Sequence, residues 1–300
     1  MAPYYAALLA DPAIAPLLPT PSASNSTLKA TSSHDLLAKL QSRNKEELDK
    51  LDQQQKKAEE NEGEMEVNAI LRNRANYYAK IGDQEKAVVA HKLAIEKAAG
   101  LGSKLDLTLA MIRIGLFFGD TSLVISSVAA AKKLVEEGGD WDRRNRLKVY
   151  EGLHLLSIRD FKRGGELFLD ALSTFTATEL IDYNDFVALT VIANTLSVKR
   201  VDLKKKIMES PEVLQVIDEL PPLRKYTKSL YDCQYGEFFK SLAEVEQQYL
   251  LPSRVLNPHA RFYVKEMRII AYAQLLESYR SVTLKSMADA FGVSEKFIDE

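Results

Sequence analysis

Three stretches between residues 65 and 180 repeat the spacing of a helical hairpin. The clearest has the turn Gly82-Asp83, a looser copy has Gly119-Asp120, and a third has Asp160. The small residues around the first turn are Ala75, Ala87 and Ala94. Small side chains let two helices approach closely, while glycine ends one helix and aspartate caps the next. The pattern therefore predicts stacked pairs of antiparallel helices.

The period of these hairpins indicates how they stack. The turns recur at intervals slightly longer than the 34 residues of a tetratricopeptide (TPR) repeat. Each hairpin leaves an apolar face that a neighbouring hairpin must cover. We therefore predict a mostly α-helical chain, in which a right-handed solenoid of TPR-like hairpins leads into a winged helix.

The last forty residues predict a long helix followed by a helix-turn-helix. Residues 261–278 carry apolar side chains at helical spacing, and Thr283 is placed to cap a helix over 284–291. Gly292 would end that helix, and Ser294 would cap the next one. A winged helix needs two further strands, so we expect the sequence to end inside this domain. Between the long helix and the helix-turn-helix, Ser281, Val282 and Thr283 form a short strand or an extended link.

Composition and the positions of proline and glycine divide the chain into five segments. Residues 1–33 are rich in Ala, Pro, Ser and Thr, which predicts a flexible tail, although Tyr4 and Leu8 would allow a short helix docked on a partner. Pro221-Pro222 is expected to end a helix that opens at Ser210-Pro211. The predicted segments are a flexible tail (1–33), a long charged helix (34–64), TPR-like repeats (65–180), further helices (181–280) and an incomplete winged helix (281–300).

Charge and cysteine content exclude several classes of protein. The net charge of −2 gives no electrostatic case for nucleic acid or membrane as the main partner. The single cysteine, Cys233, excludes an intrachain disulfide and is typical of a reducing compartment. Apolar runs fall short of the roughly 20 residues of a membrane helix, and prolines interrupt the apolar start, unlike a signal peptide. We expect the protein in the cytoplasm and nucleus.

The sequence offers little chemistry for catalysis. Its four histidines are far apart, and none has a second His or Cys at metal-ligand spacing. No glycine-rich loop has the form of a nucleotide site. Cys233 lies among Tyr and Leu without an adjacent basic residue, so it is interpreted as a structural thiol. We predict no catalytic residue, no metal and no cofactor, and therefore no enzyme.

Two basic clusters and the helix-turn-helix raise the alternative of nucleic-acid binding. The clusters are Arg143, Arg144, Arg146 and Lys148, and Lys199, Arg200, Lys204, Lys205 and Lys206. Acidic residues adjoin both clusters, and no aromatic residues interleave with them as a stacking platform. The second helix of the helix-turn-helix carries Glu295, Asp299 and Glu300, which would oppose phosphate. A solvated or protein-contacting role is the preferred interpretation.

Helical repeats that lead into a winged helix resemble the PCI-domain family, which includes subunits of the proteasome lid, the signalosome and a translation initiation factor. The motifs that carry the resemblance are residues 229–233 (SLYDC), 238–242 (FFKSL), 263–269 (YVKEMRI), 275–281 (LLESYRS) and 287–293 (MADAFGV). The likeness extends from about residue 66 and is strongest over the last seventy-five residues. The LESYRS and FGV runs favour the proteasome lid over the signalosome. By this resemblance, residues 181–280 are the helical part of the PCI domain. The N-terminal tail departs from the family pattern.

The resemblance implies a non-catalytic scaffold of the lid of the proteasome regulatory particle, acting in lid assembly and ubiquitin-dependent degradation. The implied partners are other PCI subunits of the lid, the deubiquitinase module and the ATPase ring, in a hetero-oligomer without nucleic acid or membrane. By this resemblance, Ser281, Val282 and Thr283 are the first strand of the wing sheet, whose edge would bind a partner. The alternatives are a signalosome scaffold and a nucleic-acid-binding helix-turn-helix protein.

Overall fold

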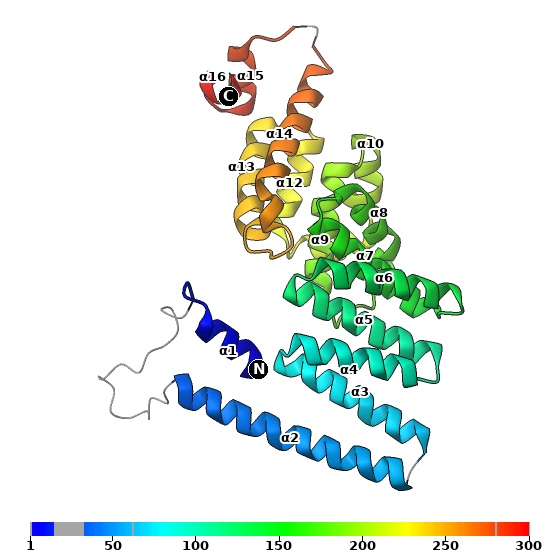
Figure 1. The fold of residues 1–300 in the computed structure, drawn as a ribbon. Coiled ribbons are helices and arrows are strands. Elements are labelled where there is room, and N and C mark those ends of the chain that lie inside the picture. The colour runs from blue at the N-terminus through cyan, green and yellow to red at the C-terminus, as the bar shows by residue number, and fades with distance from the viewer. Residues whose placement is uncertain (1, 15–32, 62, 280, 300) are drawn as a thin grey trace. The chain divides into compact units, whose positions relative to one another are not determined.

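The structure is a computed structural model that describes residues 2–14, 33–61, 63–279 and 281–299. All regular secondary structure in these ranges is helical, and successive helices pair as hairpins (Figure 1). The mostly α-helical fold predicted from the sequence is confirmed. The chain divides into two compact units, Met1–Arg143 and Arg144–Glu300, which are described separately below.

The first unit contains α1 (Ala2–Ala10), α2 (Ser33–Asn61), α3 (Glu64–Ile81), α4 (Gln84–Lys97), α5 (Leu101–Phe118), α6 (Thr121–Glu136) and the start of α7 (Trp141–Ser157). The second unit contains the rest of α7, α8 (Phe161–Leu172), α9 (Tyr183–Ser197), α10 (Arg200–Leu203), α11 (Pro211–Ile217), α12 (Pro221–Tyr231), α13 (Tyr235–Val245), α14 (Ala260–Leu276), α15 (Leu284–Phe291) and α16 (Glu295–Asp299). Within the described ranges, none of these helices combines the length and the apolar character needed to cross a membrane.

The turns α3–α4 and α5–α6 have the predicted form. Gly82 and Gly119 adopt left-handed backbone conformations, with φ of 79° and 74°. The side chains of Asp83 and Asp120 each accept a hydrogen bond from the backbone N–H three residues on, at 3.2 and 2.9 Å. Glycine therefore ends one helix and aspartate caps the next, as the sequence predicts.

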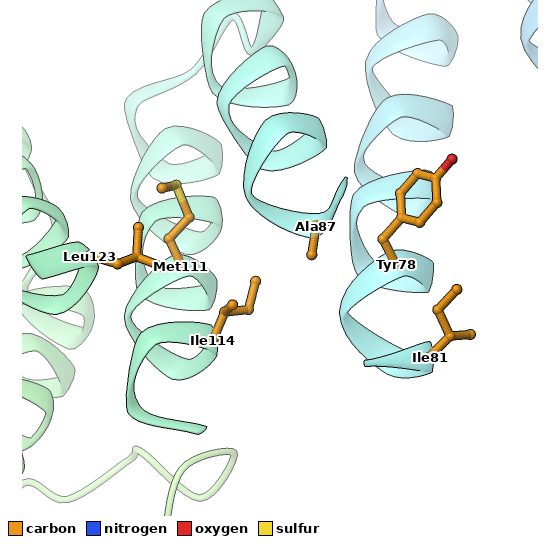
Figure 2. Close-up of a cluster of buried hydrophobic side chains, with 6 residues drawn as sticks. All are labelled: Tyr78, Ile81, Ala87, Met111, Ile114 and Leu123. Atoms are coloured by element: carbon orange, nitrogen blue, oxygen red, sulfur yellow. The ribbon is translucent and has the colours of Figure 1, made fainter. Parts of the chain in front are cut away.

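Apolar side chains from four helices form a core cluster of the first unit (Figure 2). The cluster comprises Tyr78 and Ile81 from α3, Ala87 from α4, Met111 and Ile114 from α5, and Leu123 from α6. Ala75 and Ala87 are completely buried where α3 packs against α4. Small side chains at this contact let the two helices approach, which is the steric reason for the repeat pattern.

The long charged helix is present as α2, and it lies against α3. Arg74 of α3 forms an ion pair with Asp52, with Nη1 and Oδ1 2.6 Å apart. Tyr77 donates a hydrogen bond from its hydroxyl to Asn44 Oδ1 at 3.3 Å. These polar contacts, together with Leu48 packed against the core cluster, hold a helix whose opposite face is solvated.

At the N-terminus the structure differs from the expected flexible tail. Residues 2–10 form helix α1, which lies against α2 and α3. The ring of Tyr4 packs against Phe117 and Phe118 of α5, with centroid distances of 5.5 and 6.5 Å. The contact joins residues more than a hundred positions apart, so local composition did not indicate it. Residues 15–32 of the expected tail lie outside the described ranges.

The hairpin of α7 and α8 makes its turn without glycine. Arg159 takes the left-handed position with φ of 71°, and Asp160 caps α8 through the N–H of Arg163 at 3.1 Å. Where the helices cross, a Cβ on Gly152 would lie 2.5 Å from Cε1 of Phe168. Glycine is therefore required at the crossing, where the helix backbones are close, and not at the turn.

The core of the second unit is centred on α9, whose residues 186–195 are all buried. Tyr263 of α14 donates a hydrogen bond to the carbonyl oxygen of Ile192 at 2.8 Å. Its hydroxyl also lies 2.8 Å from the hydroxyl of Tyr226 on α12. Because Tyr263 gives its proton to Ile192, Tyr226 is the donor between the two hydroxyls. Burial raises the pKa of both tyrosines, so both hydroxyls are neutral. The two hydrogen bonds therefore join α9, α12 and α14 through uncharged groups.

Two helices of the second unit end in a π-helical turn. Lys204–Met208 (η2) follows α10, and Glu246–Leu250 (η3) follows α13. The N–H of Glu209 bonds to the carbonyl of Lys204, and that of Leu251 to the carbonyl of Glu246, both at 2.9 Å. Each turn thus contains one residue more than an α-helical turn.

Candidate docking surface

The C-terminal helix-turn-helix consists of α15 and α16, and its predicted caps are present. Thr283 Oγ1 accepts a hydrogen bond from the N–H of Ser286 at 3.2 Å. Gly292 ends α15 with φ of 66°. Ser294 Oγ accepts from the N–H of Phe297 at 3.3 Å. These local bonds fix the ends of both helices, which at eight and five residues are too short to be stable alone.

An aromatic cluster holds the helix-turn-helix on the helices that precede it. The aromatic cluster comprises Tyr235 and Phe239 from α13, Tyr272 from α14, Phe291 from α15 and Phe297 from α16. Phe291 is only 1% exposed, and its ring centroid lies 4.8 Å from each of the rings of Tyr235, Phe239 and Tyr272. Phe291 is therefore the central aromatic contact of α15, which also buries Met287 and Ala288.

Arg268 of α14 provides a second attachment, for α16. Its Cζ lies 4.2 Å from the ring centroid of Phe297, and Nη2 donates a hydrogen bond to the backbone carbonyl of Phe297 at 3.2 Å. The same guanidinium lies 6.0 Å from the ring of Tyr272. A cation over an aromatic face is attracted by the ring quadrupole. Arg268 therefore connects α16 to α14.

Sequence reasoning missed the aromatic cluster as a unit, although part of its signal was present. Tyr235 and Phe239 are four residues apart, as are Arg268 and Tyr272, so each pair lies on one face of its helix. Phe291, which the sequence placed only in the skeleton of the helix-turn-helix, contacts Tyr235, Phe239 and Tyr272, whereas Arg268 contacts Phe297.

The predicted partner-binding residues lie between α14 and α15. Ser281, Val282 and Thr283 form a link without strand structure, and the backbone of Thr283 is extended, with φ of −82° and ψ of 150°. Ser281 and Thr283 are exposed, and Val282 is half-buried. Within the described part of the chain, no strand pairs with the link. Binding of a partner by these three residues therefore stays a prediction.

Large apolar side chains flank this link along the chain. Leu276 and Tyr279 precede it and are 45% and 58% exposed, and Leu284 follows it and is 47% exposed. Large exposed apolar groups concentrated in one segment are typical of protein interaction sites. The link and its apolar neighbours together form the candidate docking surface, which α13 and α14 position through the aromatic cluster.

Cys233 has a structural setting. It occupies the left-handed position of the α12–α13 turn, with φ of 58°, and is half-buried. Its Sγ accepts a hydrogen bond from Nε2 of Gln274 at 3.0 Å. Burial, and then a hydrogen bond with Cys233, raises the pKa of the neighbouring Tyr235 to about 12. In the described ranges no group of three or more His, Cys, Asp or Glu side chains is arranged to hold a metal ion.

The basic clusters are largely directed at the protein itself. Arg143 binds the carboxylate of Asp106 through Nε and Nη2, both at 2.8 Å. Arg200 donates two hydrogen bonds to the backbone carbonyl of Tyr231, at 3.1 and 2.6 Å. α16, the helix that would read a DNA groove, begins with Glu295 and is five residues long. These observations favour a structural role for the basic clusters and for the helix-turn-helix.

Comparison with known proteins places the chain among proteasome subunits. The family model described as 26S proteasome subunit RPN7 matches residues 33–206, and the PCI domain model matches residues 234–300. The first match contains the helical pairs from α3 to α8, and the second contains the aromatic cluster and the candidate docking surface.

Individual relatives give the same result. The chain is 46% identical to 26S proteasome non-ATPase regulatory subunit 6 of Oryza sativa subsp. japonica over 264 residues, which are 88% of this chain and 68% of the relative. It is 43% identical to the Dictyostelium discoideum subunit of the same name, covering 91% of this chain and 71% of the relative. It is also 40% identical to regulatory subunit RPN7 of Saccharomyces cerevisiae, covering 89% and 62%. The chain therefore belongs to the RPN7 family, the non-catalytic lid subunits of the 26S proteasome regulatory particle, and contains the PCI domain.

Proposed function

We propose that this chain is a scaffold that assembles into the proteasome lid through its C-terminal helix-turn-helix and the link that precedes it. The observation that carries the proposal is the link at Ser281–Thr283, in which Ser281 and Thr283 are exposed, next to a helix-turn-helix held by an aromatic cluster around the buried Phe291. A rigid support with an open backbone edge suits addition of a strand from another chain, because the main chain supplies the hydrogen bonds.

Other 26S proteasome subunits are partners of an RPN7 subunit. Among them we assign the PCI subunits of the lid to the C-terminal surface, and the deubiquitinase module and the ATPase ring to the helical repeats. The chain would act as part of a hetero-oligomer in lid assembly and ubiquitin-dependent degradation, in the cytoplasm and nucleus, without a cofactor of its own.

Substitution at the link tests this function. Val282→Pro removes a backbone N–H donor but permits an extended conformation, whereas the matched Val282→Ala keeps the donor. Each tagged chain is expressed in cells and purified by affinity, and its partners are identified by mass spectrometry. The proline variant should recover much less of the lid than the alanine variant.

Two controls make the result interpretable. Circular dichroism and thermal unfolding must show that both variants fold. Equal recovery of lid subunits by the proline variant, or by a chain that lacks residues 281–300, would contradict docking through this surface. Recovery of signalosome subunits in place of proteasome subunits would contradict the proposed assembly.

A further inference from the structure

A pocket of about 290 Å³ lies within the second unit, between α9 and the segment that follows α13. We call it the α9 pocket. One wall is a single face of α9, to which positions 185, 188, 189 and 192 belong. The other wall is the π-helical turn η3 and the connector after it. The lining residues are Ile181, Asp185, Ala188, Leu189, Ile192, Gln248, Tyr249, Pro252, Ser253 and Leu256.

The floor of the α9 pocket is apolar, and its rim is polar. Ile192 and Leu256 are each 1% exposed, and Ala188 is buried as well. Asp185 and Gln248, in contrast, are exposed. A ligand that fits this pocket therefore brings an apolar group to the floor and a polar group to the rim.

The charge at the rim selects the polar group. Among the ten lining residues only Asp185 is charged, and within the described ranges it forms no ion pair. Burial, and then the charge of Asp185, raises the pKa of Tyr249, so the phenol is neutral. The rim thus offers a carboxylate to a cation and offers no cation to an anion. The group that complements it is positively charged.

The wall opposite α9 is held by its own hydrogen bonds. Asn257 Nδ2 donates to the carbonyl oxygen of Leu251 at 2.6 Å, and the N–H of Leu256 donates to Ser253 Oγ at 3.3 Å. The turn η3 brings Gln248 and Tyr249 to the rim, and π-helical turns are frequent at functional sites. A wall that is ordered before binding lowers the entropy cost of binding.

The volume of the α9 pocket limits the size of its ligand. Small-molecule sites usually enclose about 300–1,000 Å³, so this pocket is at the lower end of that range. It suits one large side chain and part of a neighbouring one better than it suits a cofactor.

We propose that the α9 pocket binds a segment of a partner protein in which a leucine or similarly large apolar residue is next to an arginine. The apolar side chain occupies the floor, and the guanidinium at the rim binds the carboxylate of Asp185. Arginine suits this rim better than lysine, because its planar fork can donate to both carboxylate oxygens. The contact is separate from docking through the C-terminal surface and does not rest on it.

The test measures the binding of three capped dipeptides to the full-length chain by saturation-transfer NMR titration. The probe is N-acetyl-leucyl-arginine amide. Its leucyl-citrulline analogue has the same shape without the charge, and should bind about three- to fivefold more weakly, because an ion pair with an exposed carboxylate contributes modestly. The glycyl-arginine analogue should bind at least about tenfold more weakly, because it leaves the apolar floor empty.

Two substitutions at the rim, each with a matched control, show whether the probe is in the α9 pocket. Asp185→Asn removes the charge, and Gln248→Lys adds a cation of the chain that competes for Asp185. Each should weaken binding of the leucyl-arginine probe about three- to fivefold and remove its advantage over the citrulline analogue. Asp182→Asn and Gln247→Lys make the same changes at exposed positions outside the lining, and should leave binding unaltered.

Thermal unfolding of the four variants checks that each one folds, and Gln248→Lys carries the test if Asp185→Asn disturbs the start of α9. Equal binding of the arginine and citrulline probes would overturn the proposal. So would binding of the leucyl-arginine probe that neither rim substitution weakens, or a complete lack of saturation transfer to that probe at millimolar concentration.

Discussion

Replacing Phe291 with alanine should release the helix-turn-helix from the second unit. Complete burial of a phenylalanine side chain contributes about 1.5–3 kcal/mol. Three ring neighbours at 4.8 Å add about 0.5–1.5 kcal/mol each at most, since one ring cannot optimise all three contacts. The expected loss is therefore about 3–5 kcal/mol, which is the range measured for large-to-small changes at buried aromatic positions.

The loss should be local, because the aromatic cluster joins α15 and α16, the last two helices of the unit, to α13 and α14. Hydrogen exchange monitored by mass spectrometry separates local from global opening. Amides of residues 284–299 should exchange at least a hundredfold faster in Phe291→Ala, a factor that corresponds to about 2.7 kcal/mol. Amides of α9 should be nearly unchanged.

The matched control is Phe297→Ala. Phe297 belongs to the same cluster but is 39% exposed, so its loss should cost only about 1 kcal/mol. Affinity purification of both variants then relates this local stability to incorporation into the lid. A change of less than tenfold in the exchange of α15 in Phe291→Ala would refute the view that this ring holds the helix-turn-helix.

Three further predictions concern the cores of the two units. Tyr263→Phe should lower the free energy of unfolding by about 2–3 kcal/mol in urea denaturation, because it leaves both the Ile192 carbonyl and the Tyr226 hydroxyl without a hydrogen-bond partner. Tyr226→Phe should lower it by only about 1 kcal/mol. Equal losses for the two variants would contradict the assigned proton positions. Gly152→Ala should destabilise the protein by about 1–3 kcal/mol, because its Cβ would clash with Phe168. Gly100→Ala, with no atom within 4 Å of the new Cβ, is the control. Similar melting temperatures for the two variants would contradict the steric explanation. Burial of His91, together with the charge of Arg113, lowers the pKa of His91 below 6.5, so the unfolded chain binds the proton more readily than the folded chain. The free energy of unfolding should therefore decrease as the pH falls below about 6.5. Urea unfolding at pH 5.5 and 7.5 should show a smaller decrease in His91→Met. An unchanged dependence on pH in that variant would remove His91 from the explanation.

Local rules made much of the helical pattern predictable from the sequence. Gly82-Asp83 and Thr283 act on backbone groups within a few residues, so their capping roles could be inferred from sequence spacing alone. Glycine was a less reliable marker of the left-handed positions at helix turns. Arg159 and Cys233 occupy left-handed turn positions that glycine would occupy more readily, because the surrounding helices fix the backbone there.

Proline was misleading at one boundary. Pro221-Pro222 was expected to end a helix, but it forms the first turn of α12, where the absent N–H costs nothing because that group has no partner inside the helix. The preceding helix, α11, already ends at Ile217. Sequence alone does not distinguish a proline that stops one helix from a proline that starts the next.

Contacts between distant segments account for most of what could not be predicted. The docking of α1 depends on Phe117 and Phe118, and nothing near Tyr4 in the sequence indicates them. The candidate docking surface was only partly predictable for the same reason. The caps around Ser281–Thr283 followed from spacing, whereas the support through Arg268 and Phe291 required the tertiary structure.

The π-helical turns at the ends of α10 and α13 should let the chain lose a residue there without losing a helical turn. Each contains a surplus residue, so loss of one residue from 204–208 or 246–250 leaves enough chain to close an ordinary α-helical turn. Because both turns lie where a helix ends, such a deletion alters the following connection and does not rotate the side chains of a packed helix. Deletion of a single residue should therefore be tolerated at these two places better than within α9.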